Sequence, residues 1–265
     1  SRERHAWSGE ELMTGENMGE VALIVGGGAG VSSSCAKRFI SAGMQVAVAA
    51  RTPDKPVLVA LEKEHGIHRF PCDAADAESD ASLFEAVEEQ LGAPHLVVHN
   101  IDGRFAEIFR KDITEAEPAH VAKVFENSAF SAFLVGQQAA RCMLERPMPE
   151  GGHRGTILYT NASAALKGFP RSAAFAMACH AKDGLAQSMA RELGPQGIHV
   201  AQIPIDAAIG NTLADGSRAH WVGGPTEDDN MADPDHIAET YLQLHRQHRS
   251  TWAFEVALRP WKERW

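Results

Sequence analysis

The chain has 265 residues, of which 44% are hydrophobic and 23% charged, and a formal net charge of -10. These globular values exclude collagen-like, disordered and coiled-coil proteins, and the length suits one large α/β domain. The negative charge disfavours nucleic acid and anionic membranes as partners. The sequence contains no run of 18 apolar residues, the length that spanning a bilayer requires. The four scattered cysteines form no C-x-x-C pair, and the start lacks the apolar core of a secretory signal, which predicts a reduced cytoplasmic protein.

The first half of the chain alternates short apolar runs with amphipathic stretches. Residues 1–17 are polar without an apolar period and are expected to form a tail before a single domain over 18–265. Asp54 is expected to cap the second helix and Gly66 to end it. Strands are predicted at 21–25, 46–50, 68–72 and 96–98, with helices between them.

The second half continues the alternation. Its predicted elements are a helix over about 117–145, a strand at 156–160, a helix over about 172–193, a strand at 198–201, a long polar segment over 205–233, a helix over about 235–247 and a last strand at 252–258. Alternating strands and helices predict a single doubly wound, Rossmann-type parallel sheet with helices on both faces.

A glycine-rich segment joins the first predicted strand to the first helix. Gly26, Gly28 and Gly30 stand where backbone amides at a helix start can bind a pyrophosphate, although a tight turn needed only for packing explains them too. At the end of the second strand, Arg51 suits the 2′-phosphate of NADP, or is a solvated side chain opening a loop. Asp73, after the third strand, is a candidate for contact with adenine or for capping the next helix.

With these features the chain resembles the short-chain dehydrogenase/reductase family. The resemblance runs from about residue 20 to the C-terminus and rests on VGGGAGVS at 25–32, VHN at 98–100 and the stretch from AREL to GIHV within 190–200. Members of that family are Rossmann-fold oxidoreductases that use NAD or NADP and commonly form tetramers. The resemblance implies NADP as cofactor, with NAD as the alternative, bound by Gly26, Gly28, Gly30, Val31, Arg51, Asp73, Asn100 and Ile209.

In the resembled family, an Asn-Ser-Tyr-Lys tetrad transfers the proton that accompanies the hydride. The Tyr is the general acid or base, the Ser holds the carbonyl oxygen, the Lys lowers the pKa of the Tyr and binds the nicotinamide ribose, and the Asn positions a water. Counting along the family's pattern assigns the four positions, in chain order, to Ser128, Ala162, Phe175 and Cys179.

None of these four residues is of the type that the tetrad requires, so the usual catalytic set is expected to be lost. Asn127 lies one residue from the Asn position, and one helical step of about 100° would point it elsewhere unless the helical register slips. The chain most resembles a divergent branch of the family in which phenylalanine replaces the catalytic tyrosine and a nearby lysine remains. Lys182 could represent that lysine, and Asn161 is a second candidate for proton transfer.

The chain also departs from the family's cofactor motifs. Ser32 replaces the third glycine of the turn, and Ile101 and Asp102 add bulk and negative charge beside the cofactor. Three functions therefore remain open: an oxidoreductase with an unconventional proton donor, a non-catalytic scaffold that binds a dinucleotide or another small-molecule ligand, or a non-redox enzyme, a lyase or isomerase, that uses the same cleft.

Other polar side chains have simpler interpretations. Cys179 beside His180 is a conceivable nucleophile, but adjacent helical residues do not face each other and a small buried cysteine is expected instead. Asp206, after the sixth strand, is either functional or a loop cap. No third metal ligand accompanies either of two histidine pairs, so no metal is expected and a surface position is predicted for His65 with His68 and for His245 with His248.

The end of the chain suggests assembly. Residues 252–258 alternate large apolar residues with others, and Trp261 and Trp265 follow. Such a strand at a sheet edge, together with the family's long helices, predicts a homodimer or homotetramer in which Trp261 or Trp265 is partly buried by a partner chain. Both tryptophans folding back onto their own subunit is the alternative.

Overall fold

One parallel sheet forms the centre of the protein. The computed structural model describes residues 19–212, 218–220, 224–226 and 230–263, so the 1–17 tail and Trp265 lie outside the described residues. The sheet has the order β3-β2-β1-β4-β5-β6, and each neighbouring pair is parallel. This doubly wound order confirms the predicted fold. Its strands are β1 (Val21–Val25), β2 (Gln45–Ala50), β3 (His68–Pro71), β4 (Leu96–His99), β5 (Gly155–Ala162) and β6 (Ile198–Ile205).

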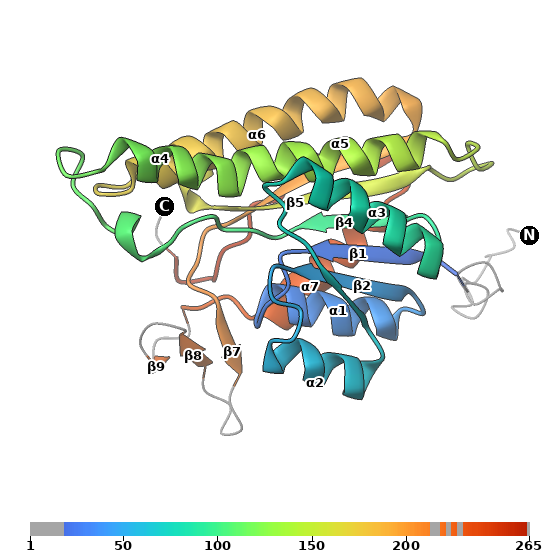
Figure 1. Ribbon diagram of the computed structural model, residues 1–265, viewed down its shortest axis with the longest axis horizontal. Helices are drawn as coiled ribbons and strands as arrows, with labels where there is room; N and C mark the ends of the chain where they lie inside the picture. The colour runs from blue at the N-terminus through green and yellow to red at the C-terminus, as the bar shows by residue number, and fades with distance from the viewer. Residues whose placement is uncertain (1–18, 213–217, 221–223, 227–229, 264–265) are drawn as a thin grey trace, which may run out of the picture.

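Helices cover both faces of the sheet (Figure 1). Successive side chains of a strand point to opposite faces, so Ala22 and Ile24 pack in the core beneath α1, α2 and α7, and Leu23 packs in the core beneath α3, α5 and α6. Among the described residues, no helix combines the length and apolarity that crossing a bilayer requires. The helices are α1 (Val31–Ser41), α2 (Pro56–His65), α3 (Ala77–Leu91), α4 (Pro118–Phe125), α5 (Ser131–Leu144), α6 (Ala173–Leu193) and α7 (Pro234–His245).

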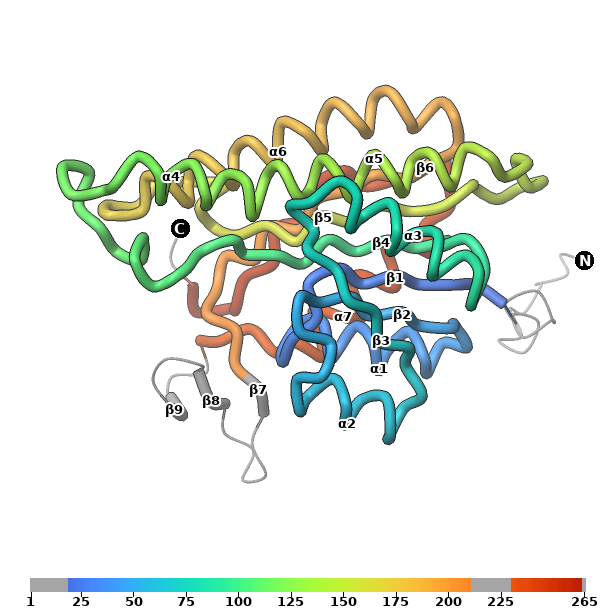
Figure 2. The backbone as a smooth tube through the Cα atoms, in the orientation of Figure 1, coloured from blue at the N-terminus to red at the C-terminus, as the bar shows by residue number. Residues whose placement is uncertain are grey.

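The predicted helix over 117–145 contains a change of helical type. A π-helical turn, η2 (Glu126–Phe130), joins α4 to α5, and Figure 2 shows the three as one continuous path. A π turn inserts one extra residue, so the side chains on its two sides no longer share one regular register. Asn127 and Ser128 lie within this turn.

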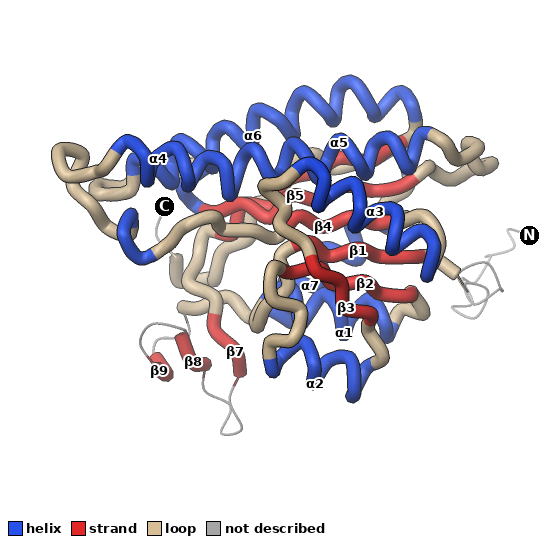
Figure 3. The backbone as a smooth tube through the Cα atoms, viewed as in Figure 1, coloured by secondary structure: helices blue, strands red, loops and turns tan. Residues whose placement is uncertain are grey.

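The polar segment over 205–233 contains three short strands where none was predicted. They are β7 (Gly210–Thr212), β8 (Arg218–His220) and β9 (Gly224–Thr226), which pair antiparallel and lie apart from the main sheet (Figure 3).

The predicted last strand, 252–258, is an extended segment with only two isolated bridges to β6, Gln202 to Glu255 and Ile205 to Leu258. Gln202 N donates to Phe254 O at 2.8 Å, and Asp206 N donates to Leu258 O at 2.9 Å. The ladder is interrupted between these bonds because Pro204 has no N–H to donate. The segment therefore extends the sheet at its edge, as expected, without forming a regular strand.

The start of α2 differs from the prediction. Lys55, not Asp54, is the N-cap residue, and Pro56 occupies the first turn, where its missing N–H is harmless. Asp54 instead accepts a hydrogen bond from Arg69 at 2.6 Å. The end of α2 is as predicted, because Gly66 is left-handed, with φ 74.

Candidate functional site

The glycine turn lies at the carboxyl end of β1, between β2 and β4. The amides of Gly26 and Gly27 both donate to Ala49 O, at 3.0 and 2.8 Å. Gly26 has φ 105, and a Cβ there would collide with the carbonyl of Asn100, so packing alone requires this glycine. A Cβ on Gly28 would instead meet no atom within 4 Å. The outer side of the turn is therefore open at the N-terminus of α1, where amides can hold a phosphate.

Ser32, which replaces the third glycine of the resembled motif, is buried and takes part in the turn. Its Oγ donates to Gly26 O at 2.8 Å and accepts from Asn100 Nδ2 at 2.6 Å. The serine thus ties the turn after β1 to the end of β4. It points into the protein, away from the open side of the turn, and leaves that side clear.

A cavity of about 460 Å³, here called the glycine-turn cavity, extends from this turn over the ends of β2 and β4. Its lining includes Gly26, Arg51, Asp73 and Asn100 from the predicted set, and also Lys55, which donates to Gly27 O at 3.2 Å. Neither Arg51 nor Lys55 forms an ion pair with a described carboxylate. The site therefore carries two cations beside the end of β2.

Val31 and Ile209, two of the predicted cofactor residues, do not line this cavity. Val31 is buried in the core beneath α1, and Ile209 packs against the same core and bridges to Ala232. Asp73 does line the cavity, but its carboxylate accepts from Ala75 N at 3.2 Å, and the cap of α3 is Asp76. Of the two roles suggested for Asp73, the helix cap is therefore wrong.

Ile101 and Asp102 line the same cavity. The Asp102 carboxylate binds the Arg104 guanidinium through two bonds, at 2.7 Å from Nε and 2.6 Å from Nη2. The negative charge of Asp102 is therefore balanced within the protein. Arg104 was not anticipated from the sequence, and it lines a second cavity as well.

The positions assigned to Ser, Tyr and Lys of the tetrad meet in the structure. Ala162, Phe175 and Cys179 form one small apolar cluster with Ala164 and Ala165. Burial raises the pKa of the Cys179 thiol to about 11, so it stays protonated at neutral pH, as expected of a buried cysteine. The aromatic ring of Phe175 has no proton to exchange, and the Arg104 guanidinium lies 3.9 Å from the ring centroid.

The π turn determines which side chain faces the cavity at the position of the tetrad Asn. Ser128 is fully buried against Gly103, and its Oγ has no hydrogen-bond partner among the described residues. Asn127 instead lines the glycine-turn cavity and donates to Gly103 O at 3.4 Å. The π turn is the slip in helical register that would let Asn127, and not Ser128, face the site, because a regular helical step does not apply inside it.

Lys182 and Asn161 are both buried. Lys182 Nζ donates to Ile101 O at 3.0 Å and to Thr160 O at 3.2 Å, so one of its three N–H groups has no partner among the described residues. Burial lowers the pKa of this amine. Asn161 Nδ2 binds Cys179 O at 3.0 Å and the Gln202 side chain at 2.9 Å. Asn161 is thus a structural tie between β5, β6 and α6, whereas Lys182 lies directly beneath the end of β4.

Asp206 and the histidines have structural partners. The buried Asp206 Oδ2 accepts from Lys167 at 3.2 Å and from Arg259 at 2.9 Å, which ties the end of β6 to the C-terminal segment. The surface position predicted for His245 was wrong: it is buried and binds Thr156 Oγ1 at 2.9 Å, because α7 packs this side onto the sheet. No cluster of three metal-ligating side chains occurs in the described part of the chain.

A doubly wound sheet with a glycine turn after its first strand defines a dinucleotide-binding type of fold. A sequence model described as enoyl-(acyl carrier protein) reductase matches residues 26–252, and the chain belongs to the short-chain dehydrogenase/reductase family. The short-chain dehydrogenase of Rhodopseudomonas palustris is similar in structure, with a TM-score of 0.71, 27% identity and coverage of 91% of this chain and 99% of its own. A metagenomic short-chain oxidoreductase solved with NADP has a TM-score of 0.73 at 19% identity, covering 93% of this chain and 100% of its own.

Curated relatives are similar over part of their length. Short chain aldehyde dehydrogenase 1 of Euphorbia lathyris is 27% identical over 190 residues, which are 69% of this chain and 61% of the relative. The 3-oxoacyl-[acyl-carrier-protein] reductase MabA of Mycobacterium tuberculosis is 29% identical over 171 residues, which are 64% of this chain and 62% of that protein. The chain thus spans less than two thirds of the length of these relatives.

Proposed function

We propose that this protein is an NADP(H)-binding oxidoreductase whose proton transfer does not pass through the usual tetrad. The observation that carries the proposal is the open glycine turn with two cations, Arg51 and Lys55, lining one cavity. The open side at Gly28 leaves room for a pyrophosphate, which the amides at the start of α1 would hold. Crystals of the metagenomic relative contain NADP, which supports the same class of cofactor here.

Arg51 should select NADP over NAD. Its guanidinium lacks a described carboxylate partner and suits bidentate binding of a 2′-phosphate. We expect Arg51→Gln to weaken NADPH binding by about tenfold to a hundredfold and to leave NADH binding within about twofold. Calorimetric titration of both dinucleotides measures this, with Arg246→Gln on the exposed end of α7 as control. Equal losses for NADPH and NADH would contradict the assignment of Arg51 to the 2′-phosphate.

The proton-transfer part of the proposal concerns Lys182. When bound, NADPH supplies a hydride, and the oxygen of a reduced carbonyl then needs a proton. Ala162 and Phe175 have none to give, and the Cys179 thiol is buried. Lys182 retains an N–H without a partner among the described residues and contacts the carbonyl of Ile101 at the cavity, and burial lowers its pKa, which makes the ammonium a readier proton donor.

A non-catalytic dinucleotide-binding scaffold is the second candidate. The position of Arg104 favours this candidate. Its side chain, stacked on Phe175 and paired with Asp102, lines both the glycine-turn cavity and the neighbouring one and so separates a bound dinucleotide from the second cavity. NADPH oxidation with a broad panel of carbonyl compounds separates the candidates. The enzyme should turn over, and Lys182→Met should reduce turnover at saturating NADPH by more than it reduces NADPH affinity, whereas the scaffold should bind NADPH without turnover.

We also propose a homo-oligomer that associates through α4, η2 and α5. Phe125, Phe130 and Phe133 are 44%, 43% and 41% exposed, and the last two rings stack at 6.2 Å, which makes an apolar surface suited to a second copy. Trp261, 78% exposed, supports a contact at the C-terminal segment. Light scattering should give a molecular mass of at least twice 28.6 kDa.

All four cysteines are free thiols, which supports a reducing compartment such as the cytoplasm.

A further inference from the structure

A second cavity adjoins the glycine-turn cavity and is lined by a concentration of positive charge. This arginine cavity has a volume of about 540 Å³ and lies between the loop after β4 and the loop that leads into α6. Its 14 lining residues include three arginines and a lysine but no carboxylate: Arg104, Arg110, Lys111 and Arg171. In a chain of net charge -10, so many cations around one cavity require an explanation.

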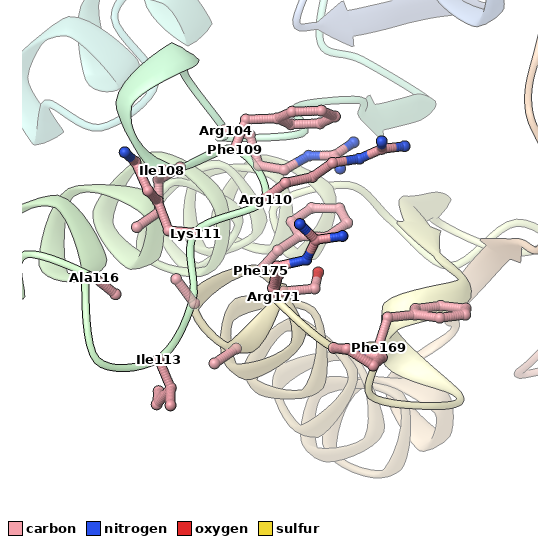
Figure 4. Close-up of a pocket in the computed structure, with 14 residues that line it drawn as sticks. Arg104, Ile108, Phe109, Arg110, Lys111, Ile113, Ala116, Phe169, Arg171 and Phe175 are labelled. Carbon is pink, nitrogen blue, oxygen red and sulfur yellow. The ribbon is translucent and has the colours of Figure 1, made fainter.

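The three guanidinium groups and two aromatic rings are arranged together. Figure 4 shows Arg104, Arg110 and Arg171 gathered around the ring of Phe175, with the ring of Phe109 on the far side and Lys111 pointing away. The Arg104 guanidinium lies 3.9 Å from the Phe175 centroid and 5.4 Å from that of Phe109. The Arg110 guanidinium lies 5.5 Å from the Phe109 centroid, so the two rings lie against two of the three guanidinium groups and favour their orientation.

The charge on these arginines is only partly balanced. Arg104 is neutralised by Asp102, but neither Arg110 nor Arg171 forms an ion pair or hydrogen bond with a described residue. Side chains of like charge that share a cavity repel each other unless an anion lies between them. The arrangement therefore leaves the capacity to bind one anionic group.

The backbone supplies an independent observation. Arg110, with φ 55, and Arg171, with φ 58, are the non-glycine residues with positive φ in the described part of the chain. The left-handed conformation is unfavourable for such residues and is found preferentially at functional sites. Both of these residues are arginines that line this one cavity.

We propose that the arginine cavity binds an organic carboxylate with an apolar body. Arg110 and Arg171 bind the carboxylate, and the apolar lining, which includes Ile108, Ile113 and Phe169, receives the body. Because Arg104 lines both cavities, a ligand here would lie next to the dinucleotide. Such a carboxylate is then the substrate class of the proposed oxidoreductase. Its role as substrate rests on that proposed function, whereas its binding in the arginine cavity does not.

Binding of 3-phenylpropanoate tests the proposal, with 3-phenylpropanamide as its uncharged counterpart. In calorimetry at low salt and without dinucleotide, the carboxylate should bind at least about tenfold more tightly than the amide. Arg110→Gln combined with Arg171→Gln should remove most of this difference, whereas Arg191→Gln, an exposed arginine at the other end of α6, should retain it. Equal affinity for the two compounds, no binding at about 10 mM, or an equal loss in Arg191→Gln would overturn the site.

The two proposals fail in different ways. The double variant should keep its NADPH affinity within about twofold, because neither arginine lines the glycine-turn cavity. Arg51→Gln should in turn keep the preference for the carboxylate over the amide. Carboxylate binding that depends on Arg51 and not on Arg110 and Arg171 would show that the anion occupies the dinucleotide site and would refute the arginine cavity.

Discussion

Replacing Gly26 with alanine should strongly destabilise the protein. The residue has φ 105, and the new Cβ would collide with the carbonyl oxygen of Asn100 and lie 2.8 Å from Ile101 Cγ1. Asn100 has little freedom to move away, because its own amide donates to Val25 O at 2.8 Å. We expect the free energy of unfolding to fall by roughly 3 kcal/mol or more, measured by urea denaturation.

Gly28→Ala is the matched substitution with the opposite outcome. No atom lies within 4 Å of the added methyl group, so the free energy of unfolding should change by at most about 0.5 kcal/mol. The methyl group would instead occupy the open side of the turn, where we place the pyrophosphate, and NADPH affinity should fall by about tenfold or more. Normal NADPH binding by Gly28→Ala would disprove this placement, and a fully stable Gly26→Ala protein would disprove the packing argument.

Acid should unfold the protein at a mildly acidic pH. Burial lowers the pKa of His95 to about 4, holds that of His99 well below its usual range, and lowers those of His153 and His199. Neutral His95 Nδ1 also accepts from Val21 N at 3.1 Å, a bond that protonation removes.

Between about pH 6.5 and pH 4, the unfolded chain therefore binds more protons at these histidines than the folded protein, and stability falls as the pH falls. Each such group contributes up to about 1.4 kcal/mol per pH unit.

Asp80 acts in the opposite direction. Burial raises its pKa to about 7, so the folded protein holds this proton where the unfolded chain, above pH 3.8, has lost it. One carboxyl group opposes four histidines, and the net effect should remain a loss of stability as the pH falls below 6.5. Urea midpoints measured at several pH values give this slope directly.

Substitutions identify the source of the acid sensitivity. His95→Asn, which keeps an acceptor for Val21 N, should flatten the pH dependence, whereas His65→Gln on the exposed end of α2 should leave it unchanged. A pH dependence in His95→Asn as steep as in the unchanged protein, or stability that rises toward pH 5, would show that His95 does not contribute to acid unfolding as argued.

The sequence by itself determined the architecture and part of the site. Apolar runs bounded by glycines predicted the five inner and long strands of the main sheet, because burial on both faces leaves a largely apolar segment in each of them, whereas the edge strand β3, with the sequence HRFP, followed from its place in the alternation. Counting along the pattern of the resembled family also assigned Ala162, Phe175 and Cys179, which do meet in one cluster.

Only the tertiary structure decided which polar groups face the cavities. The π turn turns Asn127 toward the cavity and buries Ser128, although both fit a regular helix equally well in sequence. In sequence, Arg104 is an ordinary loop residue. Only the fold places its guanidinium over the ring of Phe175, which is distant in the chain. Left-handed Arg110 likewise has no local sequence signal. These features depend on packing between distant segments, and such long-range contacts override local preferences without leaving a periodic pattern in the sequence.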